Sequence, residues 1–227
     1  MNKLFALIPL LSISFLVHSN HHEDGEHSKT MHENNFAYLS TYTMPAGSNP
    51  AMLEKNLLRN VEDLKKEGYN NCGLLRHAFG GDRAFYSYCY FDSWEQFAEI
   101  NDNVSGGDVR QLYGDHEDRL VAMDEKNLGR TNYIVMATYS FGPYLTMNER
   151  SANAKKIFDV YNEGFGGCNM MSHVWGPGLE WQIACGFDSY AEFALKQAKL
   201  GPLMSSLSDE KLDIMNHSDD IMSRVKK

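Results

Sequence analysis

The sequence predicts an α+β protein built from two tandem βαββαβ units. The first observation is a repeat: the segment from Gly68 to Ala98 recurs from Gly164 to Ala194 at a constant offset of 96 residues, with 10 of the 31 positions identical. The second observation is the order of the expected elements, which is the same in both halves. A duplicated chain of this kind predicts two similar units.

The first half begins with a strand and a helix. Phe36 to Thr43 is rich in aromatic and β-favouring residues, which is typical of a strand. Met44 to Pro50 carries glycine and proline and is expected to be a loop. From Pro50 to Glu67, apolar residues recur at helical spacing, and Gly68 stands where a C-terminal cap is expected. The apolar stripe of this helix is Leu53, Leu57, Val61 and Leu64.

A hairpin and a second helix follow. Asn70 to Phe79 and Arg83 to Phe91 are expected to be strands, because Gly80-Gly81 between them is a hairpin turn signal. Asp92-Ser93 suits the N-cap of a short helix, which we expect to break at Asn101. A fourth strand is expected over residues 119–123, and it completes the unit.

The second half repeats this order after a linker, Asn127 to Arg130. Asn132 to Ser140 matches the first strand, Met147 to Glu163 matches the first helix, and Gly176-Pro177 replaces the hairpin glycines. The tail over residues 217–222 resembles residues 116–121. Each half has the split βαβ, or ferredoxin-like, order. We therefore place the first ferredoxin-like unit at residues 35–127 and the second at residues 131–227.

The hairpin turns predict two disulfides. A two-residue turn at Gly80-Gly81 places Cys72 opposite Cys89, and the equivalent turn places Cys168 opposite Cys185. Directly opposed residues of an antiparallel pair lie about 4.5 to 5.5 Å apart at Cα, which a disulfide can span. We predict Cys72–Cys89 and Cys168–Cys185; the alternative is four buried free thiols. A metal site is not expected, since no CxxC spacing is present.

The same pairing divides each hairpin into two faces, because side chains alternate along a strand. One face is mainly apolar and should lie under the helices. The other carries tyrosine, histidine and amide groups, which are typical of a small-molecule pocket. The alternative is that this face packs one sheet against the other. Its residues are Leu75, His77, Tyr86, Tyr88 and Tyr90 in the first half and Met171, His173, Glu180 and Gln182 in the second.

The repeated histidines, His77 and His173, are candidates for ligand binding or for general base catalysis. His173 is expected to face Glu180, whose carboxylate could orient the ring or raise its pKa. His77 faces only Ala84 in the same scheme, so the second half is the better candidate. The alternative is that duplication preserved two structural core residues.

The start of the chain predicts export. Residues 1–19 have a basic start, an apolar run and small residues near a cleavage point, as in a signal peptide. The run has about 14 apolar positions, short of the roughly 20 that span a bilayer, and no later stretch is apolar enough. Residues 20–34 are histidine-rich and are expected to be a disordered tail, with metal capture as the alternative. We expect a periplasmic or secreted protein, in keeping with its four cysteines.

Two tandem βαββαβ units with a Phe-Asp-Ser step into the second helix, at Phe91 to Ala98 and Phe187 to Ala194, resemble the dimeric α/β-barrel superfamily. That superfamily includes antibiotic-biosynthesis-type monooxygenases, NIPSNAP-like proteins, haem-degrading enzymes and chlorite-dismutase relatives. The resemblance implies that the two antiparallel sheets pack into one intramolecular α/β barrel whose interior holds a substrate or cofactor. No catalytic motif of these families can be matched residue by residue.

These observations favour an exported small-molecule-binding protein with a pocket between the two sheets. The alternatives are a cofactor-free monooxygenase-like enzyme with His173 or His77 as general base, a haem- or metal-binding barrel, and a structural or partner-binding protein. A net charge of −9 argues against nucleic acid as a partner. The sequence leaves the cofactor, the presence of any enzymatic activity and homo-oligomer formation open.

Overall fold

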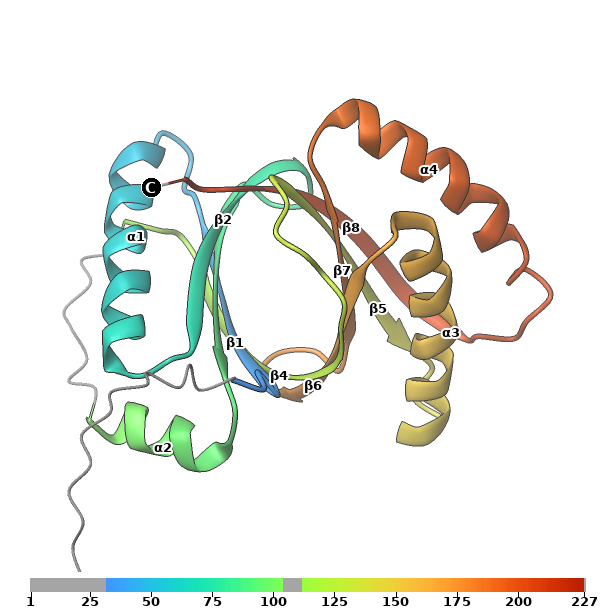
Figure 1. Ribbon diagram of the computed structural model, residues 1–227, viewed down its shortest axis with the longest axis horizontal. Helices are drawn as coiled ribbons and strands as arrows, with labels where there is room; N and C mark the ends of the chain where they lie inside the picture. Colours follow the sequence, from blue (N-terminus) through green and yellow to red (C-terminus); the bar gives the residue numbers. More distant parts are fainter. Residues whose placement is uncertain (1–31, 104–111, 227) are drawn as a thin grey trace, which may run out of the picture. The chain divides into compact units, whose positions relative to one another are not determined.

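The computed structural model describes residues 32–103 and 112–226. The predicted signal peptide and the predicted tail up to Met31 lie outside the described residues. The described chain forms two successive βαββαβ halves (Figure 1). None of its helices is long and apolar enough to cross a membrane.

The expected order of elements is confirmed in both halves. The first half contains β1 (Phe36–Thr43), α1 (Pro50–Glu67), β2 (Asn71–Gly80), β3 (Ala84–Phe91), α2 (Trp94–Asn103) and β4 (His116–Lys126). The second contains β5 (Tyr133–Phe141), α3 (Met147–Phe165), β6 (Cys168–Trp175), β7 (Trp181–Phe187), α4 (Tyr190–Ser205) and β8 (Ile214–Arg224). β4 and β8 are longer than predicted, and α2 continues through Asn101 to Asn103.

The strands close into one antiparallel barrel (Figure 1). Each half contributes four strands in the order expected for a ferredoxin-like unit, β4-β1-β3-β2 and β8-β5-β7-β6. Two contacts between the halves close the barrel, β2 with β8 and β4 with β6. Every strand of the described residues therefore has two neighbours, and these strands leave no sheet edge to attract another chain.

The helices lie outside the barrel, with α1 and α2 against the first sheet and α3 and α4 against the second (Figure 1). α1 buries its predicted stripe, Leu53, Leu57 and Val61, against β2 and β3. On the other side, Ile157 and Phe158 of α3 are buried against the second sheet. The chain thus has two outer cores between helices and strands, and a third apolar cluster inside the barrel.

Both predicted disulfides are present, one in each outer core. Cys72 bonds to Cys89 and Cys168 to Cys185, with Cα–Cα distances of 4.1 and 4.3 Å. The strand register agrees with the predicted pairing of both cysteine pairs. In each hairpin the bond therefore joins two neighbouring strands beneath a helix.

The predicted two-residue turn at Gly80-Gly81 is wrong. β2 pairs with β3 only from Asn71 to Arg76, and its end pairs with β8 instead. His77 consequently lies opposite Met222 and not opposite Ala84. The ladder shifts by one residue between His77 and Phe79, which is a β-bulge that bends a strand and re-aims its side chains. The end of β2 thus serves barrel closure.

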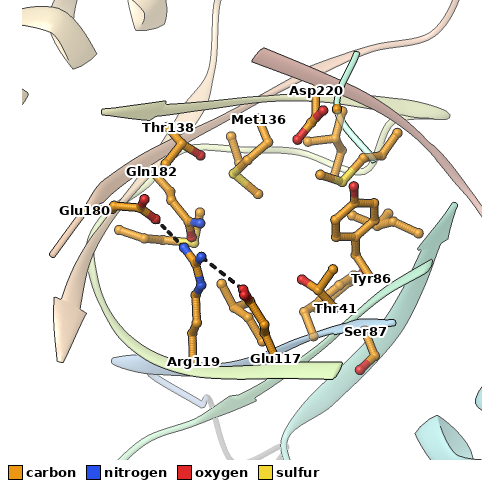
Figure 2. A pocket seen from close by; sticks show the side chains of 18 of the residues that line it. Thr41, Tyr86, Ser87, Glu117, Arg119, Met136, Thr138, Glu180, Gln182 and Asp220 are labelled. Atoms are coloured by element: carbon orange, nitrogen blue, oxygen red, sulfur yellow. Dashed lines mark hydrogen bonds and ion pairs between the residues drawn. The ribbon is translucent and has the colours of Figure 1, made fainter. Parts of the chain in front are cut away.

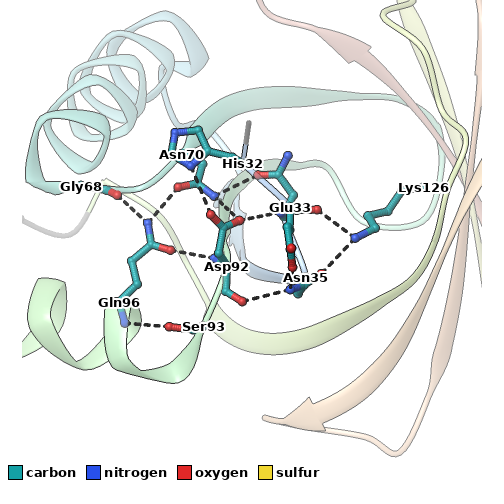
Figure 3. A network of polar contacts seen from close by, with 10 residues as sticks. His32, Glu33, Asn35, Gly68, Asn70, Asp92, Ser93, Gln96 and Lys126 are labelled. Carbon is teal, nitrogen blue, oxygen red and sulfur yellow. Dashed lines mark hydrogen bonds and ion pairs between the residues drawn. The ribbon is translucent and has the colours of Figure 1, made fainter. Parts of the chain in front are cut away.

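The repeated Phe-Asp-Ser step has a structural role. In the first half, the Asp92 carboxylate accepts a hydrogen bond from the Asn34 amide at 2.6 Å, just before β1 (Figure 3). The Ser93 hydroxyl caps α2 by accepting from the Gln96 amide at 3.2 Å. His32 also contacts Asp92, at 3.1 Å, so the last residues of the predicted tail join this network.

The second half reproduces the arrangement. The Asn132 amide donates to the Asp188 carboxylate at 2.8 Å, and the Glu192 amide donates to the Ser189 hydroxyl at 3.2 Å. The aspartate therefore fixes the start of one strand beside the end of another, while the serine starts a helix. This pairing of roles explains why both halves contain the same step.

Candidate functional site

The barrel encloses a cavity of about 450 Å³, bounded by strands of both halves (Figure 2). Its middle is apolar, with Leu39, Leu75, Ile134, Met171 and Met222 among the lining residues. One end, the acidic end, carries Asp82, Asp115, Glu117, Arg119, Glu180 and Asp220. The other, the tyrosine end, carries Tyr88, Tyr90, Leu128, Asn169 and Arg224. An apolar body with a few polar groups is the usual composition of a ligand pocket.

Arg119 of β4 crosses the acidic end between two carboxylates. It forms ion pairs with Glu180, which directly precedes β7 (Trp181–Phe187), and with Glu117 of its own strand, the latter at 3.3 Å from Nη2 to Oε2 (Figure 2). The side chains of Arg119 and Glu180 are both only 22% exposed, so solvent screens their attraction little. Because its charge is already balanced, Arg119 orders this end and is a poor partner for a bound anion.

Two buried acceptor atoms face this cavity without a hydrogen-bond partner among the described residues. They are Oε1 of Gln182 on β7 and Oδ1 of Asp220 on β8, and both residues line the cavity. Burial raises the pKa of Asp220, while the Gly81 amide and the charge of His77 lower it to a smaller extent. Buried polar atoms normally have partners, so these two are available to a molecule that brings N–H or O–H groups.

Gly80 and Gly81 pack against the Asp220 carboxylate and its neighbour. A Cβ atom at Gly81 would lie 2.4 Å from Oδ1 of Asp220, and one at Gly80 would lie 2.4 Å from the Asp219 carbonyl oxygen. Gly80 also has φ of +101°, which side-chain-bearing residues rarely adopt. The two glycines that we interpreted as a hairpin turn therefore leave room for a buried acid.

The three predicted tyrosines all line the cavity. The Tyr86 hydroxyl lies at the acidic end and donates to the Asp82 carbonyl oxygen at 3.3 Å. Burial raises the pKa of Tyr86, and it raises the pKa of Tyr90 to about 12. These hydroxyls stay protonated at neutral pH, so they act as neutral polar groups on aromatic walls.

Arg224 and Tyr88 form a contact at the tyrosine end. Nη1 of Arg224 donates to the Tyr88 hydroxyl at 2.6 Å, and Nε donates to the Thr131 carbonyl oxygen at 2.7 Å. Tyr88 can lie flat here because its neighbour on β2 is Gly73, where a Cβ atom would lie 2.3 Å from the Tyr88 hydroxyl oxygen. The position of the guanidinium therefore depends on a glycine.

The two predicted histidines are not among the residues that line the cavity. The His173 amide donates to the Glu180 carbonyl oxygen at 3.1 Å, so the two residues are opposite each other as expected. The Glu180 carboxylate, however, pairs with Arg119, not with the imidazole ring. Nδ1 of His77 is buried without a hydrogen-bond partner among the described residues.

The lining residues do not suit haem held by one of these histidines. Neither histidine reaches the cavity wall, and the wall carries five acidic side chains against two arginines. The negative charge of this wall repels the carboxylates of a haem group, except beside an arginine that has no carboxylate partner. The described residues also include no group of three or more His, Cys, Asp or Glu side chains that could hold a metal ion.

Several wall residues were not predicted from the sequence. Arg119, Asp220 and Arg224 lie on β4 and β8, whose sequences are mostly polar. A signal was available, since alternation places Arg119 on the same face as Val121 and Asp220 on the same face as Met222. Both Val121 and Met222 belong to the apolar cluster inside the barrel.

Solved structures resemble this chain in fold. No protein-family model matches the sequence, and the search of curated proteins gave no match. A candidate monooxygenase of Fusobacterium nucleatum subsp. nucleatum superposes with a TM-score of 0.59 at 9% identity, over 84% of this chain and 92% of that one. An anthrone oxidase-like protein gives 0.55 at 10% identity, over 86% and 92%. The chain has the dimeric α/β-barrel fold.

A candidate chlorite dismutase shares the α/β-barrel fold, with a TM-score of 0.53 at 12% identity, over 84% of this chain and 95% of that one. Identities this low establish the architecture and leave the chemistry to the site itself. In this α/β barrel, both ferredoxin-like units come from one chain, as the sequence resemblance implied.

Proposed function

We propose that this α/β barrel is an exported protein that binds a small organic molecule inside the barrel. The observation that carries the proposal is the cavity of about 450 Å³ with two unpartnered buried acceptors on its wall. A barrel interior of purely structural function would be filled with side chains. A ligand that donates hydrogen bonds to these acceptors would gain about 0.5–1.5 kcal/mol for each bond.

The wall chemistry defines the class of ligand. The middle of the cavity, with Leu75, Ile134 and Met171, suits an apolar or aromatic body. Oδ1 of Asp220 and Oε1 of Gln182 suit hydroxyl or amine donors at one end of that body. The ligand is therefore an amphiphilic molecule and not a fully apolar one.

Export is part of the proposal. The two disulfides suit an oxidising compartment, since cytosolic thiols are kept reduced. The predicted signal peptide over residues 1–19 would deliver the chain to the periplasm or the exterior. Expression of the full chain, followed by N-terminal sequencing of the protein recovered outside the cytosol, tests this directly; a retained Met1 would contradict it.

Native mass spectrometry of the full, non-reduced protein tests ligand binding. We expect an extra mass of a few hundred daltons that leaves on denaturation, and we expect the Asp220→Asn and Gln182→Met variants to retain less of it. A bare chain mass under native conditions, together with no binding of any added amphiphile, would overturn the proposal.

A second candidate is a cofactor-free enzyme in which the acidic end accepts a proton from the substrate. It is favoured by one observation: Asp220 is a half-buried carboxylate on the cavity wall with a raised pKa, although the Gly81 amide lies beside it. These properties suit a general base better than either predicted histidine. Deuterium exchange from solvent into the recovered ligand, abolished in Asp220→Asn, would establish the proton transfer.

A further inference from the structure

A second hollow adjoins the tyrosine end of the barrel. It has a volume of about 960 Å³ and is lined by α1, β2, residues 128–132 and the chain end after β8. We call it the vestibule. Five residues line both the vestibule and the barrel cavity: Tyr88, Tyr90, Leu128, Asn169 and Arg224. The two spaces therefore meet at this ring of residues, and Arg224 belongs to both.

Arg224 is held in place but is not neutralised. Nε donates to the Thr131 carbonyl oxygen at 2.7 Å, Nη1 donates to the Tyr88 hydroxyl at 2.6 Å, and the guanidinium lies 5.9 Å from the centre of the Tyr88 ring. No carboxylate of the described residues forms an ion pair with it. Arginine has five N–H donors, and two of them are accounted for by these contacts.

Arg224 contrasts with the other arginine of the cavity. Arg119 is paired with both Glu117 and Glu180, so its charge is balanced within the protein. Arg224 is fixed by a carbonyl and a phenol, which orient the guanidinium without cancelling its charge. A fixed guanidinium with free donors is well suited to bind a carboxylate through two parallel hydrogen bonds.

The vestibule is positively charged around Arg224. Its lining includes Lys65, Arg130, Arg224 and Lys226 against Glu62 and Asp188. Glu62 already accepts from Lys65 at 3.2 Å, and Asp188 accepts from the Asn132 amide at 2.8 Å. In a chain with a net charge of −9, a local excess of cations beside the cavity attracts anions.

We propose that Arg224 is the anchor for the carboxylate of an organic acid, which enters through the vestibule and lays its apolar body in the barrel. The proposal rests on the proposed function, because the body occupies the same cavity. The carboxylate of the ligand binds at the tyrosine end. At the opposite, acidic end, Asp220 and Gln182 accept hydrogen bonds from the hydroxyl or amine groups of the ligand. The ligand class is thus a hydroxy or amino acid with an apolar or aromatic centre.

Matched pairs of acids and amides test the assignment. Phenylacetate, 1-naphthoate and indole-3-acetate are each titrated into the full, disulfide-bonded protein beside the corresponding primary amide. We expect the acids to bind at least tenfold more tightly than their amides, as the loss of one charge-assisted contact predicts. We expect Arg224→Gln to remove that preference, so that the acid and the amide bind equally.

Two variants separate an anchor from a general charge effect. Arg130→Gln removes an exposed arginine of the same vestibule and should leave the preference for acids within about twofold, since exposed charges are screened. Arg224→Lys keeps the charge but loses the fork geometry and should keep only part of the preference. Circular dichroism and urea unfolding confirm that each variant is folded.

The outcomes distinguish the two proposals. Amides that bind as well as acids in the wild type, or a preference that survives in Arg224→Gln, would overturn the carboxylate anchor and leave small-molecule binding intact. An equal loss in Arg130→Gln and Arg224→Gln would also overturn it, in favour of long-range attraction. Failure of every acid and amide to bind, with a bare native mass, would overturn the proposed function and the anchor together.

Discussion

Arg119 and Asp220 occupy equivalent positions of the two halves, and their side chains lie on opposite sides of the same cavity (Figure 2). Residues 116–121 of β4 align with residues 217–222 of β8, and this alignment matches the arginine of one half to the aspartate of the other. At this position the duplicated halves carry opposite charges.

Replacing Asp220 by asparagine should stabilise the fold at neutral pH. Burial raises the pKa of Asp220, so the folded state binds this proton more tightly than the unfolded state does. The stabilising effect is complete below the ordinary aspartate value of 3.8 and is lost as the pH rises through the raised folded pKa. Urea unfolding at pH 4 and pH 7 should therefore show a larger gain for Asp220→Asn at pH 7. The exposed substitution Asp63→Asn is the control, and a gain confined to pH 4 would contradict the assignment.

Gly81→Ala should disturb the acidic end, although the substitution adds only one methyl group. Its Cβ atom would lie 2.4 Å from Oδ1 of Asp220, so the carboxylate must move. Because the contacts are with the far end of a flexible side chain beside a cavity, we expect a loss of at most about 1 kcal/mol in the free energy of unfolding, at the low end for overpacking. Gly129→Ala is the matched control, because nothing lies within 4 Å of its Cβ position. Equal stability of the two variants would show that Asp220 moves without cost.

Glu180→Gln should destabilise the barrel by removing a partner of a half-buried arginine. Arg119 would keep only Glu117, which lies on the more exposed side. Breaking one member of a buried pair costs up to about 3 kcal/mol, whereas surface pairs contribute about 0–1 kcal/mol. Asp63→Asn, which breaks the exposed pair with Lys66, provides the surface comparison in the same unfolding assay. Similar losses in both variants would mean that solvent screens the Arg119 site fully.

His173→Ala should leave ligand binding unchanged, whereas Gln182→Met should weaken it. The histidine is not among the residues of the cavity wall, and Gln182 offers an unpaired acceptor there. Losing one hydrogen bond to an uncharged group corresponds to about 1 kcal/mol, or roughly a fivefold change in affinity. Retention of the native mass adduct measures both. A loss of ligand binding in His173→Ala alone would show that His173 belongs to the binding site.

The two disulfides should contribute similarly to stability. Each closes a loop with a sequence separation of 17, for which chain entropy predicts about 3 kcal/mol. Cys168→Ala with Cys185→Ala, and Cys72→Ala with Cys89→Ala, should therefore lower the free energy of unfolding by comparable amounts. Urea denaturation of the two double variants checks this. A much smaller loss in one hairpin would show that the reduced chain retains that hairpin when unfolded.

The sequence predicted most of the fold because the relevant signals were local or duplicated. The helical stripe of α1 predicted its bounds, and the turn signals at Gly80-Gly81 and Gly176-Pro177 predicted the register of β2 with β3 and β6 with β7. Barrel closure, by contrast, depends on pairing between strands far apart in the chain, β2 with β8 and β4 with β6. Local sequence patterns carry no information on the register of those ladders. The end of β2 was therefore wrongly assigned to the hairpin with β3.

The candidate site was predicted only in part. Tyr86, Tyr88 and Gln182 could be placed on the inner face because hairpin alternation is strict. Arg119 and Asp220 could not be placed there. The ends of β4 and β8 are exposed and polar, so the alternation of inward and outward residues is visible only in the buried part of each strand. Whether His77 and His173 reach a pocket depended on the bulge in β2 and on the pairing of Glu180 with Arg119, which only the assembled barrel determines.

Joining both units in one chain has a consequence for how a ligand can lie in the barrel. Two identical units related by a twofold axis would give an interior that looks the same from either end. Here Tyr88 corresponds to Ala184, and Gly73 to Asn169, so the duplicated walls are no longer equivalent. A ligand inside the barrel can therefore bind in one preferred orientation, in which its two ends contact different groups, with a single copy per chain. The interior of this barrel therefore has two chemically different ends.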